Sequence, residues 1–398
     1  MEANGQKPDV LWNANYIKVW MGNFLLHFSF TLIVPLLPLY LSDAFGADKG
    51  AIGIALSGYA LVSLLVRPFS GWMVDSFPRK AVLIICHFLF FACFAGYLAA
   101  GSLTMFAIFR TLHGAPYGAA TVSASTVAID VLPSSRRAEG VGYYGLSSNL
   151  ASALAPVTAI AVLKIFEGNF KILFTLSLIV SLCGLILDCL VKLPRRDTVP
   201  EKKVISLDRF FLLPAWRQAL AIIFISFSWG VVSTYFAIYG KESLGMESGT
   251  GLFFSLCAVG LIISRLTGAR SLRKGQIARN ATLGSLTSLC AYLLFASVHN
   301  EISFYCTAFI IGLGNGHMYP AMQNMFINLA PNSQRGTANS SMFSSWDAGI
   351  GLGMLAGGFL AEHFGYPAAF WAAFVMNAIG VAIHLLWSRK HFEANKLR

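Results

Sequence analysis

Apolar residues follow one another in long runs along almost the whole chain instead of alternating with polar ones. A helix that spans a membrane needs about 20 mostly apolar residues. Strands of a membrane barrel are about 10 residues long and alternate apolar with polar side chains, which these runs do not do. The pattern therefore predicts an all-α membrane protein with twelve transmembrane helices, at residues 17–41, 50–72, 80–101, 104–129, 139–163, 170–191, 217–240, 249–269, 278–298, 302–329, 337–361 and 367–388.

The composition excludes the soluble classes of protein. The chain is 56% hydrophobic and 12% charged, whereas a soluble domain is about 45–50% apolar and about 25% charged. So few charges cannot cover the surface of a soluble protein of 43.2 kDa. The aromatic content of 13% also excludes a disordered chain.

No motif of catalysis or of metal binding is found in the sequence. The seven cysteines form no C-x-x-C pair, so neither a disulfide framework nor a zinc site is predicted. The zincin H-E-x-x-H, the hydrolase G-x-S-x-G and the P-loop are also missing. We therefore expect neither an enzyme nor a resident metal or cofactor.

Basic residues lie mainly on one side of the predicted membrane. Of the 29 lysines and arginines, 22 fall in the termini and the even-numbered loops, four fall in the other loops, and three lie within or at the end of spans. Such a bias places the basic side in the cytoplasm, so both termini are expected there. The net charge of +11 reflects this bias and indicates no nucleic acid. The short loops and tails favour the inner (cytoplasmic) membrane of a prokaryote.

The two halves of the chain repeat each other at an offset of 198 residues. Segment 131–137 is similar to segment 329–335. An identical residue also stands 198 positions after each of Phe106, Gly114, Gly118, Ile129, Ser147 and Leu154. Six spans per repeat keep the two repeats parallel, an arrangement typical of transporters that move two halves around a central site. The expected units are a six-helix bundle at 1–191, a cytoplasmic linker at 192–216 and a six-helix bundle at 217–398.

Two motifs resemble the signatures of the major facilitator superfamily. The turn after the second span reads Gly71-Trp-Met-Val-Asp75-Ser-Phe-Pro-Arg79-Lys80 and is similar to the family's G-x-x-x-D-R-x-G-R-[RK], with serine and proline at two of its positions. The fourth span carries Arg110 followed by Gly114 and Gly118, which resembles a motif common in proton-driven drug exporters. The resemblance implies the twelve-span major facilitator fold, with spans 1, 4, 7 and 10 lining a central cavity.

The turn motif is expected to act as a gate. Asp75 can lie near a helix N-terminus, whose dipole favours an anion, and it can pair with Arg79, Arg136 or Arg137. Such contacts would hold the cytoplasmic side closed in one state and break in the other. The simpler alternative is a turn aspartate in an ordinary basic loop. The expected gating residues are Gly71, Asp75, Arg79 and Lys80.

Polar groups deep in the spans are the candidates for coupling and binding, because a charge at the bilayer centre costs about 2.5–3.5 kcal/mol. For proton coupling we rank Asp347 first, Arg110 with His113 second, and His27 third. Span 11 is not a principal cavity helix in this family, which counts against Asp347. The histidines could instead be neutral groups bonded to neighbouring helices, and the aromatic residues could be ordinary packing. The expected lining of the substrate cavity is Phe30, Asn149, Trp229, Tyr235, Asn315 and His317.

These features favour a secondary transporter that exports small amphipathic or aromatic molecules in exchange for protons. A proton-coupled sugar or metabolite transporter, for uptake or efflux, is the alternative, and the residues that favour it are Asn149, Asn315, Gln323 and Asn324. The expected partners are a small-molecule substrate, protons and the lipid bilayer, and the expected oligomeric state is a monomer.

The sidedness can be tested with reporter fusions. A fluorescent protein that folds only in the cytoplasm should fluoresce when it is fused after Arg398, because the basic side is expected to be cytoplasmic. A phosphatase that is active only in the periplasm should be inactive at the same position. Phosphatase activity there would contradict both the sidedness and the parallel repeat.

Overall fold

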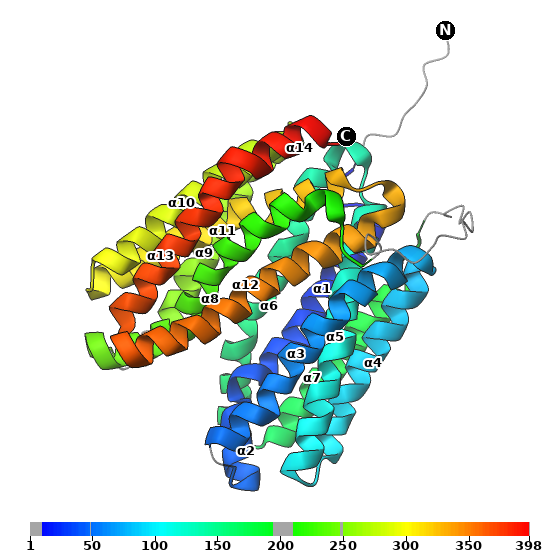
Figure 1. The fold of residues 1–398 in the computed structure, drawn as a ribbon. Helices are drawn as coiled ribbons and strands as arrows, with labels where there is room; N and C mark the ends of the chain where they lie inside the picture. The colour runs from blue at the N-terminus through cyan, green and yellow to red at the C-terminus, as the bar shows by residue number, and fades with distance from the viewer. Residues whose placement is uncertain (1–9, 48, 194–209, 247–249, 398) are drawn as a thin grey trace.

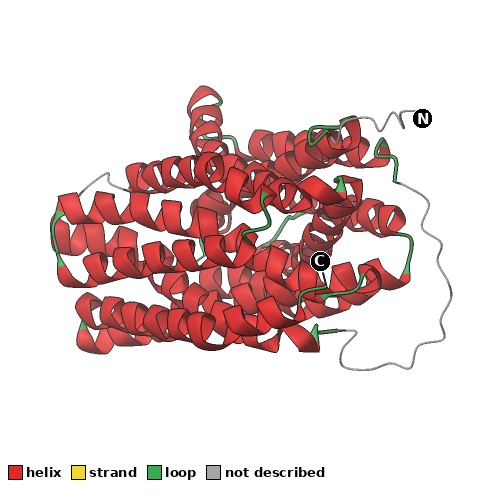
Figure 2. Cartoon of the chain, turned by 90° about the horizontal axis from the view of Figure 1, so that it is seen from above, coloured by secondary structure: helices red, strands yellow, loops and turns green. Residues whose placement is uncertain are grey.

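The computed structural model describes residues 10–47, 49–193, 210–246 and 250–397. Almost all of these residues are helical and none lies in a strand (Figure 2). The first half of the chain forms α1 (Ala14–Ile33), α2 (Leu37–Phe45), α3 (Lys49–Ser76), α4 (Arg79–Ala99), α5 (Leu103–Val131), α6 (Arg137–Ile165) and α7 (Phe170–Cys189). The second half forms α8 (Trp216–Leu244), α9 (Thr250–Arg273), α10 (Ile277–Ser297), α11 (Glu301–Leu329), α12 (Arg335–Phe364), α13 (Tyr366–Ile383) and α14 (Arg389–Asn395).

The helices follow the predicted spans, except that the first and the last span are divided. The first span changes from α1 to α2 through a 3-10 turn at Val34–Leu36, where the proline at position 35 has no N–H to continue the helical ladder. The last span passes from α13 to α14 through a π-helical turn at His384–Ser388. Most of the predicted linker falls at 194–209, outside the described residues.

Six of the described helices are long and apolar enough to cross a membrane on length and composition alone, and these are α4, α6, α7, α8, α9 and α13. The other long helices carry more polar or small residues. In α5 and α11 many of these residues are buried, so they face protein and not lipid. Small and polar residues are favoured at such helix contacts within membranes.

The helices gather into two bundles, α1–α7 in one and α8–α14 in the other (Figure 1). The bundles contact each other chiefly through α3 with α12 and through α6 with α9. Figure 1 shows them meeting near the end of the molecule where α14 lies and diverging toward the opposite end. We call the meeting end the closed end.

Glycines bring equivalent helices together inside each bundle. A side chain at Gly114 of α5 would meet the carbonyl oxygen of Tyr59 in α3, and one at Gly312 of α11 would meet that of Cys257 in α9. Both the glycines and their neighbours are 198 residues apart, so the repeat reproduces the same close backbone contact in each half. Only glycine leaves this space between helices.

A pair of glycines in α12 tests how far close packing supports the fold. A Cβ at Gly353 would meet the carbonyl oxygen of Phe227 in α8, whereas a Cβ at Gly351 would have no atom within 4 Å. Overpacking costs about 1–3 kcal/mol, so Gly353→Ala should lower the melting temperature of the purified protein. Gly351→Ala should leave it unchanged or raise it, and equal losses in both variants would contradict the packing argument.

Candidate functional site

A central cavity lies between the two bundles and is lined by helices of both. It has two lobes, with volumes of ≈ 200 Å³ and ≈ 240 Å³, which share Gly145, Ser148, Tyr319 and Trp346 in their walls. We name the smaller one the Asp347 lobe, with Asn23, His27, Arg67, Tyr117, Gln323 and Asp347 in its lining. We name the larger one the Arg265 lobe, with Asn149, Trp229, Leu261, Arg265, Ile311 and Asn315 in its lining.

An ion pair joins the two halves in the wall of the Asp347 lobe. Arg67 Nε of α3 lies 2.7 Å from Asp347 Oδ2 of α12. The Asp347 side chain is 31% exposed and that of Arg67 is 10% exposed, so the carboxylate faces the cavity while the guanidinium lies against protein. The Arg67 guanidinium also lies over the ring of Phe343, 5.3 Å from its centroid. The cation beside Asp347 is therefore Arg67, which the sequence analysis did not single out.

His27 also belongs to the Asp347 lobe. Its Nδ1 is 3.0 Å from the carbonyl oxygen of Asn23, one turn earlier in α1. Its ring meets that of Tyr117 edge-on, with 5.9 Å between the centroids. His27 and Asp347 therefore face one lobe from opposite halves of the chain.

Arg110 and His113 lie apart from the cavity, inside the N-terminal bundle. The Arg110 guanidinium stands 4.3 Å from the ring centroid of Tyr59 and 5.0 Å from that of Phe30. Cation–π contacts of this kind stabilise a cation that has no carboxylate beside it. His113 Nδ1 is 2.7 Å from Tyr97 Oη, and its ring is fully buried. Both residues thus pack an aromatic core, and Phe30 belongs to that core as well.

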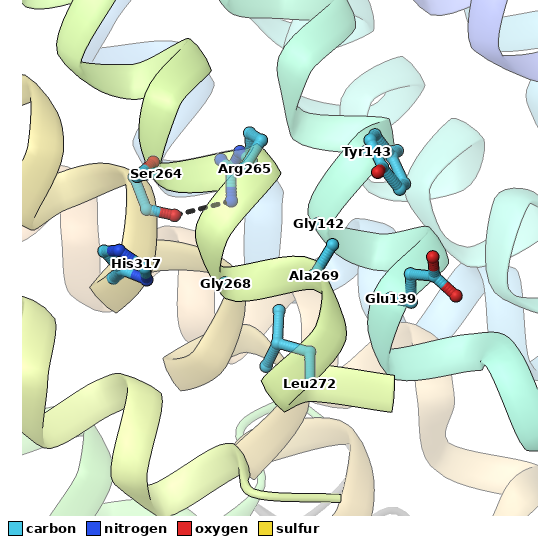
Figure 3. A pocket seen from close by; sticks show the side chains of 10 residues that line it. Glu139, Gly142, Tyr143, Ser264, Arg265, Gly268, Ala269, Leu272 and His317 are labelled. Atoms are coloured by element: carbon cyan, nitrogen blue, oxygen red, sulfur yellow. Dashed lines mark hydrogen bonds between the residues drawn. The ribbon is translucent and has the colours of Figure 1, made fainter. Parts of the chain in front are cut away.

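Three of the expected cavity residues line the Arg265 lobe, namely Asn149 of α6, Trp229 of α8 and Asn315 of α11. Tyr235 does not line it, because its hydroxyl donates to the Met354 carbonyl oxygen at 2.7 Å. His317 lines a smaller pocket between α6 and α9 (Figure 3), with Nε2 3.2 Å from Thr267 Oγ1. Successive helical residues turn by about 100°, so His317 points away from the face that carries Asn315.

Among the residues of the cavity wall that the sequence analysis missed are Arg67, Arg265, Tyr319 and Trp346. The two arginines carried a usable signal, because they are identical residues 198 positions apart in the repeat. The two aromatic residues carried none, since nothing in the local sequence distinguishes a ring in a cavity from a ring in a helix contact.

Asp75 caps a helix of the opposite half at the closed end. Its Oδ1 accepts from Gly336 N at 2.9 Å, and its Oδ2 accepts from Thr337 N at 2.8 Å and from Thr337 Oγ1 at 2.9 Å. Gly336 and Thr337 open α12, so the carboxylate satisfies free N–H groups at the positive end of that helix. Gly71 of α3 permits this approach, since a side chain there would meet Ser340 of α12.

A second carboxylate at the closed end binds one arginine from each half. Asp130 Oδ1 of α5 accepts from Arg79 Nη1 at 2.6 Å and from Arg335 Nη1 at 2.8 Å. Arg79 also reaches the Asn332 carbonyl oxygen at 3.2 Å. Lys80 is partly exposed at the start of α4. Of the expected partners of Asp75, Arg79 contacts it, with Nη2 3.2 Å from Oδ1, whereas Arg136 pairs with Glu139.

Polar contacts between the halves continue from this end to the floor of the cavity. Gln323 Nε2 donates to Ser125 Oγ at 2.9 Å, and Asn339 Nδ2 donates to Thr126 Oγ1 at 3.1 Å. Gln323 also lines the Asp347 lobe. The cavity is therefore sealed on the side of the closed end by hydrogen bonds that cross from one half to the other.

Comparison with known proteins gives consistent matches along the chain. The family model described as Major Facilitator Superfamily matches residues 19–325 and 281–397. The chain is 22% identical over 408 residues to the multi-drug resistance efflux pump PmrA of Streptococcus pneumoniae, which covers 98% of this chain and 100% of that protein. It is 23% identical to the staphylopine export protein of Staphylococcus aureus, over 86% of this chain and 87% of that protein. The crystal structure of the transporter FucP in the outward conformation superposes with a TM-score of 0.79 at 16% identity, over 94% of this chain and 99% of that one.

The gate can be tested at Asp75. Asp75→Asn removes the charge and one of the two acceptor oxygens, and hydrogen bonds to a charged group contribute about 1.5–3 kcal/mol. We expect the closed end to open about tenfold more often, transport to slow, and the affinity for substrate to stay within a few fold. Single-molecule FRET across the closed end, alongside a binding assay, measures both properties.

The matched control is Glu393→Gln at the same end, which breaks an exposed pair with Lys396. Exposed ion pairs contribute little, so this variant should behave as the wild type. If Asp75→Asn lost substrate binding while its conformational exchange stayed normal, Asp75 would be a binding residue and not a gate.

Proposed function

The chain belongs to the Major Facilitator Superfamily, and on this premise we propose that it exports small amphipathic or aromatic molecules in exchange for protons. A member of this family moves small molecules across a membrane, so the chain is a transporter and not an enzyme. Two bundles around one cavity suit alternating access, in which the cavity opens to one side at a time. The relatives named as a multidrug efflux pump and as an export protein support transport of the substrate out of the cell.

The cavity wall supports a partly aromatic substrate. Trp229, Tyr319 and Trp346 contribute large rings to the Arg265 lobe, and such rings bind flat apolar groups over a wide area. Charged side chains are few in both lobes. The lining of the Asp347 lobe is largely polar, whereas the Arg265 lobe combines apolar and aromatic side chains with a small number of polar groups, as is typical of small-molecule sites.

The ion pair between Arg67 and Asp347 is the observation that carries the coupling to protons. A carboxylate at this depth is costly unless it is neutralised, and either Arg67 or a proton can neutralise it. Because Arg67 and the proton compete for one carboxylate, protonation of Asp347 breaks the ion pair that joins α3 to α12. Proton binding is thereby linked to relative movement of the halves. His27 faces the same lobe and is the next candidate, while Arg110 with His113 is weaker because neither reaches the cavity.

Orientation and organisation complete the proposal. With both termini in the cytoplasm of a cell whose inner membrane holds the protein, the closed end is cytoplasmic and the cavity opens outward in this conformation. The bundles are residues 1–191 and 217–398, joined by the cytoplasmic linker 192–216. One chain encloses the whole cavity, so it acts as a monomer, and its partners are substrate, protons and lipid, with no nucleic acid.

A sugar or a polar metabolite is the second candidate substrate. Asn149 and Asn315 face the Arg265 lobe, and amide groups can donate to and accept from hydroxyl groups. A panel of labelled sugars and aromatic compounds tested by counterflow in proteoliposomes separates the two readings. Counterflow of sugars alone would favour this candidate over the export of amphipathic molecules.

Asp347 is the position at which coupling can be separated from transport. Asp347→Asn should abolish accumulation driven by a pH gradient in proteoliposomes, because an amide cannot bind and release a proton. It should keep downhill exchange of labelled substrate, since the cavity wall remains. Asp43→Asn, which changes an exposed carboxylate at the end of α2, should retain both activities.

A different carrier would give a different pattern. If gradient-driven accumulation survived in Asp347→Asn and was lost in His27→Gln or His113→Gln, the proton carrier would be a histidine. Asp347 would then serve only to bind Arg67.

A further inference from the structure

The internal repeat relates the two charged corners of the cavity. Arg67 of α3 and Arg265 of α9 are 198 residues apart, and so are Asn149 of α6 and Asp347 of α12. The pair of Arg67 with Asp347, between α3 and α12, therefore has its counterpart between α9 and α6, where Arg265 and Asn149 line the same lobe. One corner holds an arginine with a carboxylate, and the other holds an arginine with an uncharged amide.

Arg265 has no counterion within the described part of the chain. The residue is only 5% exposed, its Nη1 donates to the Gly316 carbonyl oxygen at 2.7 Å (Figure 3), and its Nε has no hydrogen-bond partner. The nearest acid that shares a pocket with it is Glu139, which pairs with Arg136 at 2.9 Å. A buried cation without a partner is costly, so this corner is suited to an incoming anion.

The wall beside Arg265 leaves room for such a group. A Cβ at Gly145 of α6 would lie 3.3 Å from Arg265 Nη2, so a larger residue there would crowd the guanidinium on the cavity side. Asn149 follows one turn later in α6, and Asn315 faces the lobe from α11. The planar fork of an arginine matches the two oxygens of a carboxylate, and amide N–H groups can donate to the same oxygens.

We propose that Arg265, with Asn149 and Asn315, binds the carboxylate of an organic anion whose apolar or aromatic body lies against Trp229, Tyr319 and Trp346. This inference rests on the proposed function and names the substrate class of the same cavity. The substrate carboxylate pairs with Arg265 in the same way that the Asp347 carboxylate pairs with Arg67. An organic cation finds no free carboxylate among the described residues of the cavity wall, because Asp347 is already paired, and Arg265 repels it.

A matched pair of probes tests the charge requirement. 1-Naphthaleneacetate and its neutral amide, 1-naphthaleneacetamide, differ in the carboxylate, and binding to the purified full-length protein can be followed by quenching of tryptophan fluorescence. A charge-assisted pair with arginine should make the acid bind about tenfold more tightly than the amide. Equal binding of the two probes to the wild-type protein would overturn the inference.

Three variants locate the effect. Arg265→Gln should abolish the preference for the acid and leave binding of the amide unchanged. Asn149→Asp places a carboxylate in the position equivalent to Asp347 and should also abolish the preference, by neutralising Arg265 from within. Arg273→Gln, which removes an exposed arginine from the same helix, should bind both probes as the wild type does. Tight binding of the acid by folded Arg265→Gln would show that the carboxylate lies elsewhere.

The outcome for the anion site can be distinguished from the outcome for the proposed function. If proteoliposomes exchange neutral or cationic aromatic compounds for protons and the protein prefers no carboxylate, the anion site fails and the function stands. If the acid binds through Arg265 and a pH gradient drives no transport, the coupling fails and the anion site stands. If no probe is bound or exchanged, both are wrong.

Discussion

A charged group inside a membrane protein needs a partner from the protein, because lipid tails offer none. In this chain that constraint is met in part by contacts from one half to the other. Asp75 of α3 accepts the free N–H groups that open α12, and Asp130 of α5 binds Arg335. Arg67 pairs with Asp347 in the same way inside the cavity. The conformation of the whole molecule therefore depends on a few polar contacts that can be broken and remade.

Most of the close backbone contacts at glycines lie inside the bundles, and one between the bundles, at Gly71 and Gly336, lies at the closed end. Within a bundle, helices meet backbone to backbone at glycines such as Gly114 and Gly312, contacts that tolerate little movement. Between the bundles, Gln323 and Asn339 reach across the closed end with side-chain hydrogen bonds. Tight contacts within each half and hydrogen bonds between the halves suit two rigid bodies that rock against each other.

The repeat makes the cavity nearly symmetric, and the exceptions to the symmetry are informative. Both halves supply an arginine, Arg67 or Arg265, at equivalent positions in the wall. Within the described residues, only the first arginine has a carboxylate beside it, since Asn149 stands where symmetry would place a second aspartate. The two lobes therefore differ in chemistry within one fold. One contains Asp347, which a proton can neutralise, and the other contains Arg265, which is left for a ligand.

The sequence alone determined the class of fold, the positions of the spans, the repeat and the family, because run length, spacing and turn motifs are local properties of the chain. It also placed Asp75 near a helix N-terminus and Asp347 deep in a span. Only the tertiary structure decided that the helix is α12, that the partner of Asp347 is Arg67, and that His113 and His317 face away from the central cavity. These facts depend on the rotation of each helix about its axis and on contacts between residues up to about 280 positions apart. Hydropathy says little about helix rotation or about distant contacts, because in a membrane the apolar side of a helix can face either lipid or protein.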